Sequence, residues 1–376
     1  MLKETLENLI KNSSSLITIQ EIAIKILNNQ RISVNEACEL YHHAPLSMLG
    51  MLAFNIKQQK SGDKVFFNRN FHIEPTNICV NNCRFCSYKK PQGDTQAWEM
   101  TMDEILHKVS QYKDSGATEC HIVGGVHPDR DINYYGTLIK EVKKIIPGIV
   151  VKAFTAVEID YMIKKAGISI EDGLKRLKEC GLESIPGGGA EIFDETLRNK
   201  ICPEKTSSQR WLEIHKTAHQ LDIKTNATIL YGHIETIEQR FEHLNRLRLL
   251  QDETQGFNCF IPLKYRHENN SMSQIGETPL IDDLKTYAIS RIFLDNFPHI
   301  KAYWVMSGLE TTKLALQYGA DDIDGTVNNS TKIYSMAGVS GKPTMTVEQI
   351  VDAIKQVNLI AVERDTFYNE IKIYND

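Results

Sequence analysis

The chain has 376 residues, of which 41% are hydrophobic and 8% aromatic, so it is long enough to bury a large core in one barrel with an appendage. Its 43 basic and 48 acidic residues are scattered and give a net charge of −5, which excludes the basic stripe of a nucleic-acid binder. No segment reaches the ~20 apolar residues needed to span a membrane, and the N-terminus lacks a signal-peptide core, so we expect a cytoplasmic protein without membrane insertion.

The first part of the chain is predicted to be helical. Apolar residues recur with a helical period over Thr18–Asn28, and Ser33–Glu36 matches a capping box at the start of another helix. We therefore predict an N-terminal helical cap over residues 1–65. A barrel would follow over residues 66–376 and include a C-terminal helical segment.

A cysteine loop follows the first predicted strand, Phe66–Pro75. Cys79, Cys83 and Cys86 have a C-x3-C-x2-C spacing and no fourth ligand close by. Three thiolates suit an iron–sulfur cubane whose fourth iron stays open, whereas a closed electron-transfer cluster or a structural zinc site uses four protein ligands. The spacing, with Phe85 before the third cysteine, resembles the signature of the radical S-adenosylmethionine (SAM) enzymes, in which SAM binds the open iron and is cleaved to a 5'-deoxyadenosyl radical.

Other interpretations of these cysteines stay open at this point. They could form half of a zinc site that His72 or His121 completes, or they could be buried thiols. Eight cysteines are too few for a disulfide scaffold, and a reducing compartment suits three reactive thiolates. The remaining ones are interpreted as core or surface residues: Cys38, Cys120, Cys180, Cys202 and Cys259.

Helical and strand patterns alternate after the cysteine loop. Further strands are predicted at His121–Val123, Ile149–Phe154, Glu183–Ile185, Lys224–Leu230, Gly256–Pro262, Ile300–Trp304 and near Asp322. Such alternation implies parallel strands, and about eight βα units predict an α/β fold, a TIM-type (β/α)8 barrel. Its catalytic groups would lie at the C-terminal strand ends, where the polar loops Pro91–Gln96 and Glu268–Glu277 could cover a substrate.

Three strand ends resemble SAM-binding motifs. Gly124 and Gly125 follow the second strand, at the place of the glycine-rich motif for the SAM amino group. Glu158 follows the third strand and resembles the acid that accepts the ribose hydroxyls, although a helix N-terminus also favours such a carboxylate. The fourth strand ends in the chain's only triple glycine, which would allow adenine or the sulfonium to approach closely: Gly187, Gly188 and Gly189.

Two more residues are assigned to the cofactor. The guanidinium of Arg198 could hold the methionine carboxylate in a bidentate pair, and a surface arginine is the alternative. Tyr88, two residues after the third cysteine, is also assigned to cofactor binding.

Longer runs carry a narrower resemblance, which covers about residues 65–370. It is to the aminofutalosine synthases, radical SAM enzymes of the futalosine route to menaquinone. Two sister families share the cluster loop and the PGGGAE-like run: cyclic dehypoxanthinyl futalosine synthase and the tyrosine-using subunit of the deazaflavin (FO) synthase. The runs that carry the resemblance are HIEPTNIC, IPGGGAEIF, NATILYGHIET, LRLLQDETQGFNCFIPL, LDNFPHIKAYW, ADDIDGT and VERDTFY, and the third and fourth favour the first family.

The resemblance implies a 4Fe-4S cluster on the three cysteines, SAM as a co-substrate and an external one-electron reductant such as flavodoxin or ferredoxin. The adenosyl radical would add to the vinyl carbon of 3-[(1-carboxyvinyl)oxy]benzoate. Rearrangement and decarboxylation would then give 6-amino-6-deoxyfutalosine.

Polar residues of the predicted strand ends are candidates for the substrate pocket, which must tolerate two carboxylates. Together they make the barrel interior more polar than stability alone requires. His72, Glu74 and His233 are the ones expected to handle protons. The whole set is His72, Glu74, Asn226, Thr228, His233, Tyr265, Arg266 and Asp295.

Residues elsewhere are interpreted as structural. Trp304 is expected in the core, and Arg364 with Asp365 is expected to close the barrel floor. Two function classes remain besides a radical enzyme, namely a one-electron Fe-S carrier and a structural zinc protein. The carrier would need a fourth cluster ligand, and the convergent glycines and Glu158 argue against it.

Overall fold

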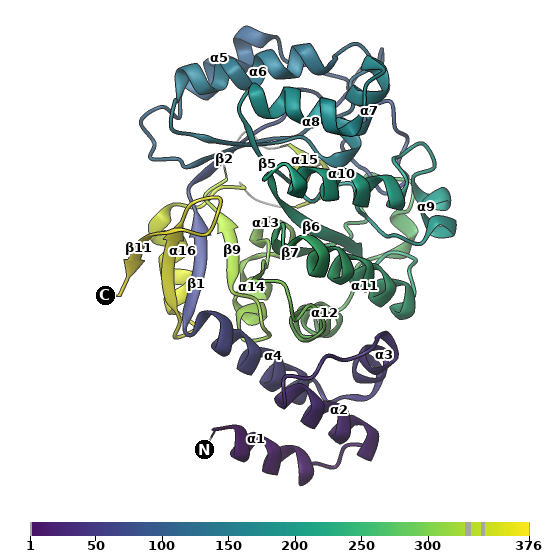
Figure 1. Ribbon diagram of the computed structural model, residues 1–376, viewed down its shortest axis with the longest axis vertical. Coiled ribbons are helices and arrows are strands. Elements are labelled where there is room, and N and C mark those ends of the chain that lie inside the picture. Colours follow the sequence, from purple (N-terminus) through teal and green to yellow (C-terminus); the bar gives the residue numbers. More distant parts are fainter. Residues whose placement is uncertain (1, 328–331, 340–342, 376) are drawn as a thin grey trace.

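A ring of parallel strands forms the centre of the computed structural model, which describes residues 2–327, 332–339 and 343–375 (Figure 1). The strands are buried on both faces because helices cover the outside, and in β6 seven of eight residues are buried. Seven strands pair in chain order: β2 (Asn70–Ile73), β3 (Glu119–Ile122), β4 (Val150–Ala153), β5 (Leu182–Ile185), β6 (Lys224–Tyr231), β7 (Phe257–Lys264) and β8 (His299–Ile300).

Two further strands complete the ring. A parallel bridge between Lys301 and Asp322 joins the end of β8 to β9 (Asp322–Gly325). β9 pairs in parallel with β1 (Lys64–Asn68), and only Arg69 separates β1 from β2. The predicted (β/α)8 barrel is therefore confirmed, with its first strand divided into β1 and β2.

The C-terminal region differs from the helical segment that we predicted. One helix, α16 (Val347–Lys355), is followed by two strands, β10 (Ile360–Arg364) and β11 (Glu370–Tyr374). β10 pairs in parallel with β1, and β11 pairs antiparallel with β10. β10 begins with the short apolar run Ile360–Val362, which is typical of a buried strand, and our prediction of a helical segment overlooked it.

β10 leads into a turn that closes the barrel at the end where its strands begin. The Nε of Arg364 donates to Oδ2 of Asp322 at 2.7 Å, and the hydroxyl of Thr366 donates to Glu119 at 2.8 Å. We predicted floor closure through Arg364 and Asp365. The floor is closed by this run, but the carboxylate that Arg364 binds is Asp322, and Asp365 supplies only its backbone carbonyl.

Helices surround the barrel (Figure 1). Threonine capping boxes begin several of them, for example at Thr101, Thr155 and Thr236, where the side chains satisfy backbone N–H groups of the first turn. In the described ranges, no helix has the length and apolar character to cross a bilayer. The longer outer helices are α5 (Met102–Ser110), α6 (Ile132–Ile145), α7 (Ala156–Ala166), α8 (Ile170–Glu179), α10 (Ser208–Gln220), α11 (Ile237–Thr254), α12 (Leu280–Phe293) and α14 (Leu309–Leu316).

Short helices lie in the connections between these elements: α9 (Glu195–Ile201), the 3-10 turn η1 (Ser273–Ile275), α13 (Trp304–Ser307) and α15 (Ile333–Met336). The strand predicted over Ile300–Trp304 is wrong beyond its first residue, because Trp304 begins α13. Its indole N–H donates to the carbonyl of Gly325 at 2.9 Å, and the side chain is buried as expected.

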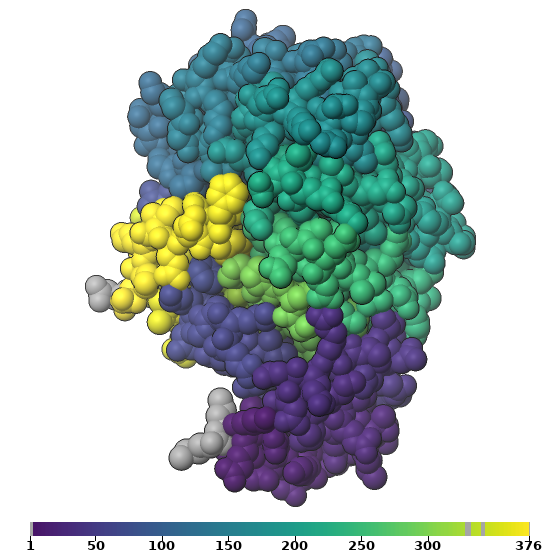
Figure 2. All heavy atoms as spheres, in the orientation of Figure 1, coloured from purple at the N-terminus to yellow at the C-terminus, as the bar shows by residue number. Residues whose placement is uncertain are grey.

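Four helices precede the barrel, as predicted: α1 (Leu2–Lys11), α2 (Ile17–Leu27), α3 (Val34–His43) and α4 (Leu46–Ser61). The capping box of Ser33 and Glu36 starts α3. Arg31 pairs with Asp252 at 2.6 Å and with Asp295 at 2.8 Å, beside the start of β7 and β8. The four helices form the lower end of the molecule in Figure 2. Because Asp295 pairs with Arg31 beside these helices, the prediction that Asp295 faces the barrel interior is wrong.

Candidate functional site

The cysteine loop lies at the C-terminal end of β2, where the sequence predicted it. Neighbouring loops hold its backbone. The N–H of Val80 donates to Val126 after β3, at 2.9 Å. The N–H of Arg84 donates to Ile201 at 2.7 Å, and the carbonyl of Arg84 accepts from Ser271 at 3.0 Å. Loops that follow β3, β5 and β7 therefore position the three thiols at the mouth of the barrel.

The surroundings of the thiols fit an iron–sulfur cluster. Burial raises the pKa of Cys79, and the backbone N–H groups of Val126 and Asn81 oppose that effect. Burial also raises the pKa of Cys86, to about 11. Among the described residues, no three histidine, cysteine or acidic side chains are placed to share one metal ion. A cluster does not need that arrangement, because its thiolates bind different irons.

Lys205 and Cys202 adjoin Cys83, and sequence reasoning missed both. The hydrogen bond with Cys202, and then the positive charge of Lys205, lower the pKa of Cys83 to about 7 against the effect of burial. The Nζ of Lys205 lies 2.5 Å from Oε1 of Glu191 and 5.2 Å from the centroid of the Phe85 ring. The site thus has a half-buried cation beside the cysteine loop.

Glu158 is buried and bound to backbone on two sides. Its Oε2 accepts from the N–H and the hydroxyl of Thr155, at 2.7 and 2.8 Å, and its Oε1 accepts from the N–H of Gly124 at 3.2 Å. Burial raises its pKa to about 7. The carboxylate therefore caps α7 and joins it to the loop after β3, while its contact with a ribose stays a prediction.

The two glycines after β3 are required by close packing of loops. A Cβ on Gly125 would lie 2.2 Å from the carbonyl oxygen of Ile78, and one on Gly124 would lie 2.9 Å from that of Thr76. The hydroxyl of Tyr88 donates to the same Thr76 carbonyl at 3.0 Å, and its side chain is buried. These three residues set the path of the cysteine loop, and their contacts with a cofactor stay predictions.

The triple glycine lies against β6 and α7. A Cβ on Gly187 would lie 2.7 Å from the carbonyl oxygen of Asn226, and the hydroxyl of Thr228 donates to the carbonyl of Gly187 at 2.7 Å. Gly189 has a φ of +86°, which favours glycine, and a Cβ there would lie 2.5 Å from Val157. Two predicted lumen residues of β6 thus support this loop.

Arg198 is almost fully buried and is bound by backbone carbonyls. Its NH1 group donates to Ala190 and, at 3.0 Å, to Ile192, and its NH2 group donates to Thr206 and, at 3.4 Å, to Gly189. Its side chain therefore holds the loop after β5. The predicted contact with a methionine carboxylate stays a prediction, and Lys205 lies closer to the cysteine loop.

Glu74 and His72 come from the end of β2. The carboxylate of Glu74 accepts from the backbone N–H of Lys332 at 2.7 Å and of Ile333 at 3.3 Å, and burial raises its pKa to about 7. The Glu74 side chain therefore holds the start of α15 at the barrel mouth. His72 faces the interior, where its ring centroid lies 4.5 Å from that of His121, and burial lowers its pKa to about 4.

His233 lies in the loop after β6, and both ring nitrogens have partners. Nε2 donates to the carbonyl of Leu230 at 3.0 Å, and Nδ1 accepts from the N–H of Ile234 at 2.7 Å. The hydroxyl of Tyr265 donates to a neighbouring loop residue, Asn270, at 2.8 Å. Arg266 donates to Glu277 at 3.1 Å. Each of the three predicted residues thus has a local partner, and their contacts with substrate stay predictions.

A layer of ionised side chains fills the barrel interior around the two histidines. Lys152 lies 2.6 Å from Glu119, and Lys301 lies 2.5 Å from Asp324. Burial would raise the pKa of Glu119, but Lys152 and Lys301 outweigh it and lower the pKa to about 2. Sequence reasoning overlooked this layer, although charged residues within otherwise apolar strands were a visible signal.

Some residues at the same end of the barrel have left-handed backbone conformations. Phe154, Glu191, Asp324 and Val327 have positive φ values of 60°, 48°, 76° and 49°. They lie in or after β4, β5 and β9, and Phe154 and Val327 are of the bulky types that avoid this conformation. Other non-glycine residues with positive φ lie away from the mouth, among them Asp222, Gln255 and Tyr368, so backbone conformation alone does not mark the site.

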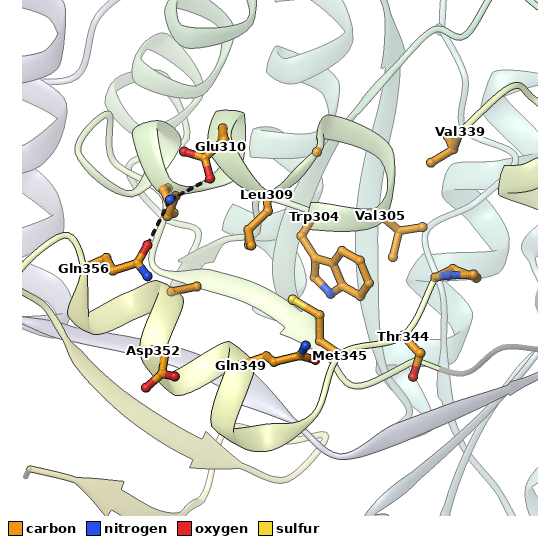
Figure 3. Close-up of a pocket in the computed structure, with 14 residues that line it drawn as sticks. Trp304, Val305, Leu309, Glu310, Val339, Thr344, Met345, Gln349, Asp352 and Gln356 are labelled. Atoms are coloured by element: carbon orange, nitrogen blue, oxygen red, sulfur yellow. Dashed lines mark hydrogen bonds and ion pairs between the residues drawn. The ribbon is translucent and has the colours of Figure 1, made fainter. Parts of the chain in front are cut away.

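A separate cavity of about 560 Å³ lies outside the barrel, between α13, α14 and α16 (Figure 3). Trp304, Leu309 and Met345 line it, and Lys313 bridges Glu310 and Gln356 along its edge. None of the predicted cofactor residues lines this cavity.

Two family models match the chain. The model of the radical SAM superfamily matches residues 73–247, and that of the CofH/MqnC C-terminal region matches residues 254–375. The first match includes the cysteine loop and the strand ends after β3, β4 and β5, and the second includes β7 to β11.

Curated relatives span almost the whole chain. It is 41% identical to the aminodeoxyfutalosine synthase of Thermus thermophilus, over 94% of this chain and 96% of that one. Identity to the aminodeoxyfutalosine synthase of Streptomyces coelicolor is 39%, over 94% of each chain. It is 34% to the cyclic dehypoxanthine futalosine synthase of the same organism, over 95% of this chain and 90% of that one.

A solved structure has the same fold. The crystal structure of methylornithine synthase superposes with a TM-score of 0.70 at 17% identity, over 90% of this chain and 96% of that chain.

Proposed function

The chain belongs to the radical SAM superfamily, in the group of aminodeoxyfutalosine synthases and their sister enzymes, and we propose that it forms 6-amino-6-deoxyfutalosine. The substrates would be SAM and 3-[(1-carboxyvinyl)oxy]benzoate, with rearrangement and decarboxylation. Identities of 41% and 39% to two aminodeoxyfutalosine synthases, against 34% to the cyclase, carry this choice.

Cys79, Cys83 and Cys86 are the residues proposed to hold a 4Fe-4S cluster, which the superfamily implies. When bound, the reduced cluster and SAM supply a 5'-deoxyadenosyl radical. The chain contributes thiols at the barrel mouth, N–H groups near Cys79, and the positive charge of Lys205, which favours a thiolate at Cys83. An external one-electron carrier, flavodoxin or ferredoxin, would supply the electron, and a reducing cytoplasm suits the thiols.

Lys205 is the cation that we propose for the methionine carboxylate of SAM, in place of Arg198. It lies beside Cys83 and its only charged partner in hydrogen-bond range is Glu191, among the described residues. Glu158 is proposed to accept the ribose hydroxyls, with Gly124 beside it. Arg198 would then act as a positioning residue for the glycine loop.

Glu74 and His233 are proposed as positioning residues of the mouth, because their polar atoms already bind backbone. His72 lies deeper, on the interior face of β2, and remains our candidate for a contact with the substrate.

One assay tests the proposal. Reconstituted enzyme, reductant, labelled SAM and the enol ether should give a coupled product with the mass of 6-amino-6-deoxyfutalosine, with one SAM consumed per product. A cyclase is the second candidate, since the C-terminal match is to the CofH/MqnC type. In that case dehypoxanthinyl futalosine would be consumed, label would appear in free 5'-deoxyadenosine, and the enol ether would remain.

A further inference from the structure

His121 stands out among the polar groups of the barrel interior. Its Nε2 is buried and has no hydrogen-bond partner within the described part of the chain. Its neighbours in the same layer are paired: Lys152 with Glu119, and Lys301 with Asp324. Buried polar atoms are nearly always satisfied in folded proteins, so an unpaired one that faces the interior points to a missing partner.

The position of His121 is shallow. In the parallel register it lies beside His72 on one side and Lys152 on the other. Ile122, the next residue, ends β3, so this layer lies only about 3 Å below the end of the strand. His121 as a whole residue is half-buried, although its Nε2 is enclosed.

The opposite wall is apolar. β7 lies four strands from β3 in the ring, and Cys259, Ile261 and Leu263 share its interior face by alternation. Cys259 is fully buried beside the ionised layer, whereas Ile261 and Leu263 are half-buried. Aliphatic side chains that keep exposed surface inside a barrel are available to pack against a flat apolar ligand.

The ionised layer does not supply a free charge for an anion. Lys152, Lys301 and Arg364 are balanced by Glu119, Asp322 and Asp324. A bound carboxylate would therefore depend on an uncharged donor. Burial holds the pKa of His121 well below its usual value, so the ring is neutral and carries one N–H.

We infer that the upper interior binds an aromatic carboxylate, with its carboxylate accepting a hydrogen bond from His121 and its ring packed on Ile261 and Leu263. The inference rests on the proposed function, since it assigns residues to the benzoate end of the proposed substrate. It makes His121 and β7 the residues that select an aromatic acid.

Calorimetry without reductant tests this, because the SAM-loaded holoenzyme then binds ligands but does not turn over. Benzoate and the enol ether should bind the wild type, and benzamide should bind at least tenfold more weakly than benzoate. In His121→Leu the dissociation constants of both acids should rise about ten- to hundredfold, the range of a hydrogen bond to a charged group. His121→Gln, which keeps a donor, should recover part of the loss, and Ile261→Ala should weaken both acids several-fold.

Exposed His107 on α5 provides the matched control, and His107→Leu should bind as the wild type does. SAM affinity and iron content should be unchanged in all variants. Equal affinity for benzoate in His121→Leu and in the wild type would overturn the inference, as would benzamide binding as tightly as benzoate. If acids bind through His121 but no 6-amino-6-deoxyfutalosine forms in the assay, the proposed function fails and the subsite stands.

Discussion

The two ends of the barrel both carry buried charges, but these charges have different partners. Where the strands begin, charged side chains bind each other: Arg364 pairs with Asp322, and Arg291 pairs with Asp321 at 2.6 Å. Where the strands end, Glu158 and Glu74 bind backbone N–H groups of the loops, although Glu191 pairs with Lys205. Mutual pairing neutralises and closes the floor. Carboxylates that bind backbone shape the mouth and leave its thiols available for chemistry.

The largest effect that this contrast predicts is at the thiols. Cys79→Ala, Cys83→Ala or Cys86→Ala should each abolish cluster binding and activity, because two thiolates do not hold a cubane that three are proposed to bind. Iron content after anaerobic reconstitution and product formation measure this. Cys120→Ala and Cys259→Ala are the controls and should keep a full cluster. Normal iron content and turnover in any one of the first three variants would remove that cysteine from the ligand set.

Substitution in the barrel floor should lower the free energy of unfolding. Arg364→Met leaves the carboxylate of Asp322 buried without its arginine, which should lower the free energy of unfolding by about 3 to 5 kcal/mol. Denaturant titration measures this. Arg31→Met is the matched control, since that arginine pairs with Asp252 at the surface and such pairs contribute about 0 to 1 kcal/mol. Equal losses in the two variants would contradict a structural role specific to the floor.

The mouth should have a distinct pH dependence, which Glu74→Gln exposes. The pKa of Glu74 is raised from 4.5 to about 7, so the folded state holds this proton more tightly than the unfolded state. Its contribution to the free energy of unfolding is therefore present below about pH 4.5 and lost as the pH rises to 7. The free energy of unfolding of the wild type minus that of Glu74→Gln should therefore fall across this pH range, by up to about 3 kcal/mol.

Unfolding midpoints of both proteins, measured from pH 4.5 to 7.5, provide the test of Glu74. The buried histidines contribute equally to the pH dependence of both proteins, so their contribution cancels in the difference. Glu171→Gln changes an exposed glutamate of α8 and should produce no such trend. A difference that is constant with pH would show that Glu74 does not hold a raised pKa in the folded state.

Local patterns predicted the barrel, the cysteine loop and the position of the glycines at strand ends, because each depends on a short segment of sequence. Strand alternation located β3 to β7, and the capping box located α3. The contacts between loops were beyond such reasoning. Lys205 meets Glu191 and Cys83 only because separate loops converge in space, and the carbonyl partners of Arg198 could not be foreseen, while its assignment to SAM stays a prediction. The two-residue β8 was overextended, since its apolar pattern continues into α13.

SAM affinity sharpens the comparison at the mouth. Glu158→Gln should raise the SAM dissociation constant about ten- to hundredfold, because a hydrogen bond to a charged group contributes about 1.5 to 3 kcal/mol. Glutamine still completes a capping box with Thr155, so α7 should stay folded and iron content should stay full. Equilibrium binding of SAM measures the effect. Unchanged affinity would leave Glu158 with its structural contacts alone.

The smallest effect expected separates Lys205 from Arg198. Lys205 already pairs with Glu191, so replacing that carboxylate by the one of SAM should add less binding free energy than a new ion pair would. Lys205→Gln should therefore weaken SAM binding roughly tenfold. That variant also leaves the enclosed carboxylate of Glu191 without its charged partner, so some loss in the free energy of unfolding is expected beside the weaker SAM binding. Arg198→Met instead leaves carbonyls of Ala190 and Ile192 without their donor, so it should chiefly destabilise the loop. Measuring SAM affinity and unfolding for both variants decides the assignment. Weaker SAM binding in Arg198→Met at unchanged stability, with Lys205→Gln unaffected, would return the carboxylate contact to Arg198.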